Sequence, residues 1–137
     1  RYPIDVKQFE KNLKEMLDSG FNANISCTIS LLNVFDLIDI NNYYKNKFKA
    51  NVNFNSIVTT PNFLSIRHLP IDIKQKLLKQ LDVPVYDRRG VSKFQLVKTQ
   101  LKLDGDTSKL EKAFNYMDKL SKNRNFDWRK LWPDFLK

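Results

Sequence analysis

The fold is decided by residues 25–58, ISCTISLLNVFDLIDINNYYKNKFKANVNFNSIV. Apolar residues alternate with Ser and Thr over 25–31, and this period of two predicts a strand. Residues 36–48 begin with an aspartate that can cap a helix and continue with apolar residues at helical spacing. A second apolar run at 52–58 predicts a second strand. Because a helix separates the two strands, we expect them to be parallel neighbours.

Helical patterns extend on both sides of this unit. Residues 5–19 carry apolar residues at helical spacing and open with a capping box. Three later segments show the same spacing, namely 70–81, 92–103 and 108–122. We therefore predict an α/β fold in which residues 1–81 form βα units with parallel strands. Residues 82–137 are expected to form a mainly helical C-terminal portion with an aromatic tail.

The composition, 42% hydrophobic and 28% charged, is typical of a globular protein. No run approaches the roughly 20 apolar residues that a membrane span requires. The start also lacks the order of a signal peptide, so we expect a cytoplasmic protein with no membrane partner. Cys27 is the one cysteine, which excludes an intrachain disulfide and a cysteine-rich metal site within this chain. Its apolar neighbours Ile25 and Ile29 predict a place in the core.

The net charge of +9 allows two interpretations. Lys, Asn and Ile are abundant together, as in AT-rich genomes, and we favour this coding bias as the explanation. The alternative is a surface that binds nucleic acid through phosphate contacts and the aromatic tail. The lysines of that predicted surface lie on two helices and are Lys93, Lys98, Lys102, Lys109, Lys112, Lys119 and Lys122.

Few residues suggest catalysis. There is no glycine-rich phosphate loop, and His68, the only histidine, is expected on the surface or in a loop. Polar residues lie at the C-terminal ends of the two predicted strands, with Ser30 and Asn33 at the end of the first and Thr59 and Thr60 at the end of the second. Parallel α/β proteins bind ligands at this edge. Ordinary turns use the same residue types, so position alone leaves both interpretations open.

Several stretches carry a family resemblance. They are Arg1-Tyr2-Pro3 before a helix, residues 25–33, residues 55–70, Arg124-Asn125-Phe126 and Trp132-Pro133-Asp134-Phe135. In this order they resemble the late strands and the tail of twitch-type radical S-adenosylmethionine proteins of phages and environmental bacteria.

The resemblance implies a partial (β/α) barrel and a small-molecule or peptide substrate. In such a protein a [4Fe-4S] cluster cleaves S-adenosylmethionine to a 5'-deoxyadenosyl radical. Arg1 would then follow the fourth barrel strand and meet the ribose or carboxylate of the cofactor. Ser30 and Asn33 would close the fifth strand, and Thr59 and Thr60 would top the sixth.

The chain departs from this family in lacking its Cys-x3-Cys-x2-Cys motif, and Cys27 alone cannot hold a cluster. We expect a fragment whose partner, the cluster-binding barrel half, precedes Arg1. It would form one wall of the pocket for S-adenosylmethionine and substrate and be inactive alone. A degenerate relative without radical chemistry is the alternative within the family. Outside it, a small basic nucleic-acid-binding module and an interaction domain without a ligand stay open.

Overall fold

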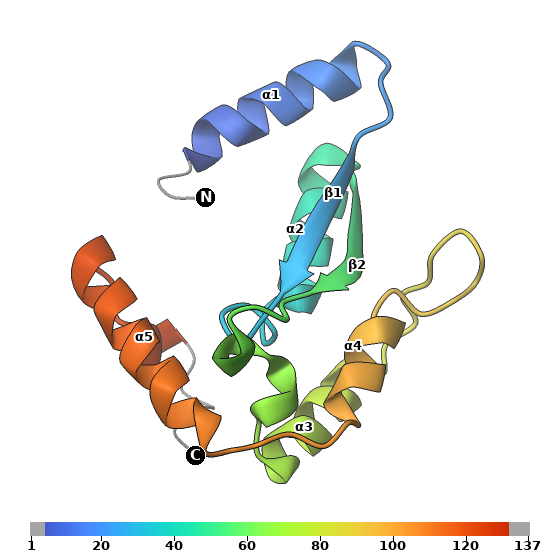
Figure 1. Ribbon diagram of the computed structural model, residues 1–137. Helices are drawn as coiled ribbons and strands as arrows, with labels where there is room; N and C mark the ends of the chain where they lie inside the picture. Colours follow the sequence, from blue (N-terminus) through green and yellow to red (C-terminus); the bar gives the residue numbers. More distant parts are fainter. Residues whose placement is uncertain (1–4, 132–137) are drawn as a thin grey trace.

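The computed structural model describes residues 5–131 and contains both helices and strands (Figure 1). Its first four elements are α1 (Val6–Asp18), β1 (Asn24–Ile29), α2 (Leu37–Phe48) and β2 (Asn51–Ile57). Two short 3-10 helices, η1 (Asn62–Leu64) and η2 (Ile66–His68), come next. The remaining helices are α3 (Ile71–Gln80), α4 (Gln95–Leu101), α5 (Lys109–Arg124) and α6 (Trp128–Leu131).

The two strands form a parallel pair, with Asn24 opposite Asn51 and Ile29 opposite Ile57. α2 is the crossover between them, which confirms the predicted strand–helix–strand unit. The register shifts by one extra residue in β2 after Asn53, so β2 contains a bulge. The pairing continues past β2, because the Val58 N–H donates to the Ile29 carbonyl at 2.8 Å. The mixed fold with parallel strands is therefore confirmed.

The first helix begins and ends at residues that suit those positions. The Asp5 carboxylate accepts the Gln8 N–H at 3.1 Å, which is the predicted N-cap contact. After the helix, Gly20 adopts a φ of 83°, a conformation that side chains disfavour. Most of α1 is accessible to solvent, because Leu13 is the only residue of this helix that is buried. Phe9 meets the Tyr44 ring of α2 edge-on, with centroids 6.2 Å apart.

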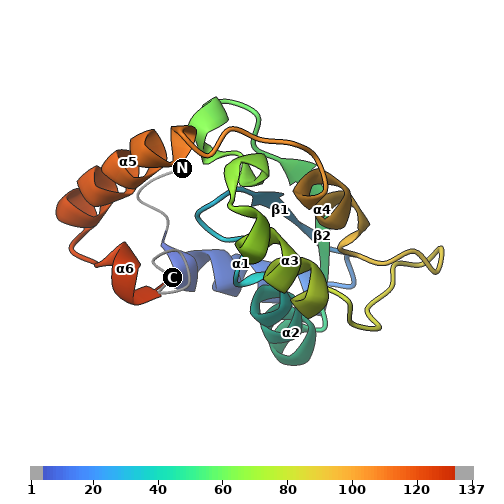
Figure 2. The same cartoon turned by 90° about the horizontal axis from the view of Figure 1, so that it is seen from below.

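The hydrophobic core joins early and late parts of the chain. Phe54 of β2 packs against Phe94, just before α4, with ring centroids 5.1 Å apart. Farther along, Trp128 of α6 is fully buried and stacks on Phe114 of α5. All four side chains pack in a core cluster that also contains residues of β1, α2 and α3. Figure 2 shows α3 and α4 lying together beside the strands, with α5 and α6 to one side.

A loop between α3 and α4 projects from the side of the molecule in both views (Figures 1 and 2). It folds back on itself through an antiparallel bridge between Tyr86 and Ser92. Lys93 is held in this turn as well, because its N–H donates to the Val85 carbonyl at 2.9 Å. The predicted helix start at residue 92 is therefore wrong, and α4 begins at Gln95. None of the described helices is long and apolar enough to cross a membrane.

Candidate functional site

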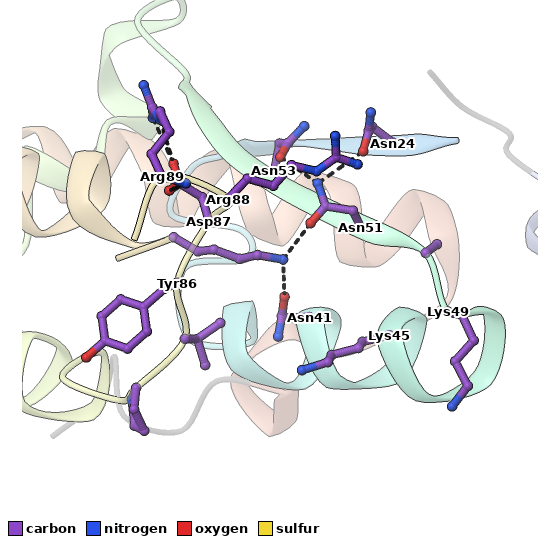
Figure 3. Close-up of a pocket in the computed structure, with 14 residues that line it drawn as sticks. Asn24, Asn41, Lys45, Lys49, Asn51, Asn53, Tyr86, Asp87, Arg88 and Arg89 are labelled. Atoms are coloured by element: carbon purple, nitrogen blue, oxygen red, sulfur yellow. Dashed lines mark hydrogen bonds and ion pairs between the residues drawn. The ribbon is translucent and has the colours of Figure 1, made fainter. Parts of the chain in front are cut away.

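A pocket of about 710 Å³ lies at the amino-terminal end of the two strands (Figure 3). We call it the basic pocket. Strand beginnings, the helix α2 and the loop between α3 and α4 form its walls. Its polar lining consists of Asn24, Asn41, Lys45, Lys49, Asn51, Asn53, Tyr86, Asp87, Arg88, Arg89 and Lys93.

The lining is strongly positive, since it contains five lysine or arginine side chains and one carboxylate. Asp87 is that carboxylate, and the Arg89 guanidinium binds it at 2.8 Å. Together with the Val91 N–H, this contact lowers the pKa of Asp87. None of the other four cations, Lys45, Lys49, Arg88 and Lys93, forms an ion pair with a carboxylate within residues 5–131, although the charge of Asp87 acts to raise the pKa of Lys93. In Figure 3 the Arg88 side chain extends toward Asn24.

At the floor of the pocket, Lys93 binds two asparagine side chains and so sets their orientation. Its ammonium donates to Asn51 Oδ1 at 2.7 Å and to Asn41 Oδ1 at 3.3 Å, contacts drawn as dashed lines in Figure 3. Burial lowers the pKa of Lys93, and the nearby charge of Lys45 lowers it further. An ammonium only donates hydrogen bonds. Both asparagine side chains must therefore turn their oxygens toward it.

This orientation passes from one asparagine to the next. With its oxygen on Lys93, Asn51 turns its Nδ2 group toward Asn24 Oδ1, at 3.1 Å, and Asn53 Oδ1, at 3.0 Å. The Nδ2 groups of Asn24 and Asn53 make no hydrogen bond within residues 5–131. The pocket therefore offers mainly donors, amide and cationic, to a ligand. Such a lining suits an anion rich in acceptor oxygens, as a phosphate is.

The residues predicted from the strand ends lie at the opposite, carboxyl edge of the pair. Ser30 is buried, and its N–H donates to Asn33 Oδ1 at 3.0 Å. Asn33 Nδ2 donates to the Thr28 carbonyl at 2.9 Å, so both side-chain ends of Asn33 are used within this turn. Thr59 and Thr60 are exposed just beyond β2. The structure thus brings these four residues to one edge, and Arg1 lies outside the described residues.

The predicted lysine-rich surface is divided among different local contacts. Lys98 pairs with Asp82 at 3.3 Å. Lys109 donates to Asn62 Oδ1 at 2.9 Å. Lys112 lies over the Phe63 ring, 5.3 Å from its centroid. Of the seven lysines predicted for that surface, Lys93 is the one that lines the basic pocket.

His68 was predicted to lie on the surface or in a loop, but it is buried in η2 and only 6% exposed. Its Nδ1 accepts the Asp106 N–H at 3.0 Å, so the ring proton resides on Nε2. Nε2–H then donates to Asn62 Oδ1 at 2.8 Å. Burial and the charge of Lys109 lower the pKa of His68. His68 thus joins η2 to the segment before α5 as a neutral ring.

Acid is expected to weaken this connection. The unfolded chain takes up a proton on His68 near pH 6.5, whereas the folded chain does so only at lower pH. Stability should therefore fall as the pH drops below about 6.5, by at most about 1.4 kcal/mol per pH unit for one proton. Urea titrations between pH 7.5 and 5.5 measure this slope. His68→Gln should flatten it, and an unchanged slope in that variant would contradict the assignment.

The described residues offer no site for a metal cluster. No group of three or more His, Cys, Asp and Glu side chains among residues 5–131 could hold a metal ion. Cys27 packs against the core, as predicted, but it is only half-buried. Burial raises the pKa of its thiol. A [4Fe-4S] cluster does not fit these residues, so its ligands would have to come from elsewhere.

The asparagines of the basic pocket are not among the predicted site residues, because coding bias accounts for a high Asn content. One signal was present in the sequence. Asn is disfavoured in strands, yet Asn51 and Asn53 alternate with Val52 and Phe54 at the start of a strand. This alternation places the two asparagines on one face of β2, and the apolar pair on the other face is buried.

Comparison with known proteins gives no relative for this chain. No protein-family model, no curated protein and no solved structure matches it. The function is therefore inferred from the chemistry of the basic pocket.

Proposed function

We propose that this chain is a small nucleic-acid-binding module that holds phosphate groups in the basic pocket. The observation that carries the proposal is the donor-rich lining, in which Lys93 turns the asparagine oxygens away from the ligand. Backbone phosphates present acceptor oxygens and a negative charge, and arginine, lysine and asparagine side chains are common partners for them. The net charge of +9 adds a long-range attraction for a polyanion.

A paired charge removal tests this function. Lys45→Gln with Arg88→Gln removes two exposed cations from different walls of the pocket. Exposed ion contacts are worth up to about 1 kcal/mol each, so a labelled single-stranded oligonucleotide should bind roughly tenfold more weakly. The slope of log affinity against log salt should also fall, by about 0.7 for each lost phosphate contact. Fluorescence anisotropy at several salt concentrations measures both quantities.

Lys76→Gln with Lys79→Gln is the matched control. Both lysines are exposed on α3, outside the pocket lining and outside the predicted lysine-rich surface, and the net charge changes by the same amount. The control should bind nearly as well as the wild type. Equal losses in the two double variants would mean that general charge, and not the pocket, drives binding. No salt-dependent binding by the wild type would refute the proposal.

The second proposal is the radical S-adenosylmethionine fragment, with a partial barrel completed by an N-terminal half. The parallel β1–α2–β2 unit favours it, as does the gathering of Ser30, Asn33, Thr59 and Thr60 at one edge. The cluster ligands would come from that other half. Sequencing the coding DNA upstream of Arg1 tests the proposal. An open frame with Cys-x3-Cys-x2-Cys supports it, and a frame without that motif contradicts it.

A further inference from the structure

A second pocket, of about 290 Å³, adjoins the basic pocket. Asn53, Asp87, Arg89 and Lys93 line both, so the two hollows meet at these four side chains. We call the second one the side pocket. Beyond the shared residues its lining comes from β2, the end of the loop and α4, and consists of Phe54, Asn55, Val91, Ser92, Gln95, Leu96 and Thr99.

The side pocket differs from the basic pocket in chemistry. Apart from the shared residues its lining has no charged side chain, and Val91 and Leu96 present apolar side chains to it, whereas the Phe54 side chain is buried in the core. Val91 is 40% exposed, which leaves its side chain available for contact. Gln95 is also exposed and presents a carboxamide, which both donates and accepts hydrogen bonds. An uncharged, flat, partly apolar group with polar edges suits this lining.

The boundary between the pockets is fixed by the loop. The Arg89 guanidinium is bound to Asp87, and the Lys93 backbone is bound to Val85. An anion on one side of this boundary and a neutral ring on the other would meet matching surfaces. A nucleotide contains both groups, joined through its sugar.

We propose that the two pockets together hold one unstacked nucleotide of a single strand, with its phosphate in the basic pocket and its base in the side pocket. This inference rests on the proposed nucleic-acid function and names the form of nucleic acid. In a duplex the bases are paired and stacked inside, so a base reaches a protein pocket readily only from a single strand. Single strands should therefore bind more tightly than duplexes of equal length.

Ligands without bases test the inference. We would compare a single-stranded oligodeoxynucleotide, an abasic strand of equal length and a duplex, all at one salt concentration. The abasic strand loses the hydrogen bonds and apolar contacts of a base in the side pocket, so it should bind about tenfold more weakly. The duplex should also bind more weakly than the single strand.

A protein variant locates the effect. Gln95→Ala removes one hydrogen-bonding group, so it should weaken binding of the ordinary single strand about threefold and leave binding of the abasic strand unchanged. Gln100→Ala, on the same helix but outside both pocket linings, is the control. Equal affinity for abasic, single-stranded and duplex ligands would overturn the inference and leave phosphate binding intact. Absence of salt-dependent binding to every ligand would instead overturn the proposed function.

Discussion

Replacing Trp128 with alanine is expected to lower the free energy of unfolding by about 3–5 kcal/mol, the usual range for a large buried aromatic ring. The ring is fully buried and stacks on Phe114, with centroids 5.3 Å apart and planes at 12°. Its Nε1–H donates to Asp118 Oδ1 at 2.7 Å. The substitution leaves a cavity and removes this hydrogen bond. Urea unfolding followed by circular dichroism measures the loss.

Trp128→Phe is the matched control. It keeps an aromatic ring against Phe114 and removes the indole N–H, so it should cost only about 1–2 kcal/mol. A loss below about 1 kcal/mol in the alanine variant would contradict the packing of α6 against α5. If Trp128→Phe lost as much stability as Trp128→Ala, the stabilisation would come from the hydrogen bond to Asp118 and not from the packing of the ring.

The second large effect is expected from Gly105→Ala. A Cβ atom at this position would overlap the Arg67 carbonyl group and lie 2.9 Å from the backbone nitrogen of His68. The neighbouring backbone is tied down, because the Asp104 carbonyl accepts from Arg67 Nη2 at 3.1 Å and the Asp106 N–H donates to His68. Relief of the clash would break these contacts. We expect a loss of about 3 kcal/mol or more, measured as a lower urea midpoint.

Gly20→Ala separates this clash from ordinary glycine effects. Gly20 has a φ of 83°, but the space beside it is open, since no atom of residues 5–131, apart from Gly20 and its two chain neighbours, lies within 4 Å of the position that an added Cβ would take. Its alanine variant should lose only about 1 kcal/mol, because the left-handed conformation is strained for a side chain. If the two alanine variants lost similar free energies of unfolding, the segment around Gly105 would be able to move away from the Arg67 carbonyl group without destabilising the fold.

Local patterns predicted the elements of the fold, whereas the pocket depends on long-range contacts. The period of two at 25–31 and the helical spacing at 36–48 identified β1 and α2, because each pattern lies within a few adjacent residues. The floor of the basic pocket instead joins Lys93 to Asn51, 42 positions apart in the chain. It also requires the parallel register that sets Asn24 opposite Asn51. No local pattern carries that information.

His68 shows the same limit in a single residue. A lone histidine beside a proline turn suggests exposure when only its neighbours in sequence are considered. The partner that accounts for its burial is the Asp106 N–H, 38 positions away. The positions of the strand-end residues were easier to predict, because neighbouring parallel strands end at the same edge of a sheet. Ser30, Asn33, Thr59 and Thr60 do follow neighbouring strands. Their role is a separate matter from their position.

The hydrogen bonds that join Asn51 to Asn24 and Asn53 have a consequence for the groups that the pocket presents to a ligand. One ammonium, that of Lys93, sets the direction of every hydrogen bond from Asn51 outward to Asn24 and Asn53. Carboxamides have nearly the same shape in either orientation. A neutral residue at position 93 would free the series to reverse and present oxygens in place of N–H groups. A single codon change beneath the binding surface would thus turn the asparagines from donors into acceptors, while Lys45, Lys49, Arg88 and Arg89 keep the pocket positive.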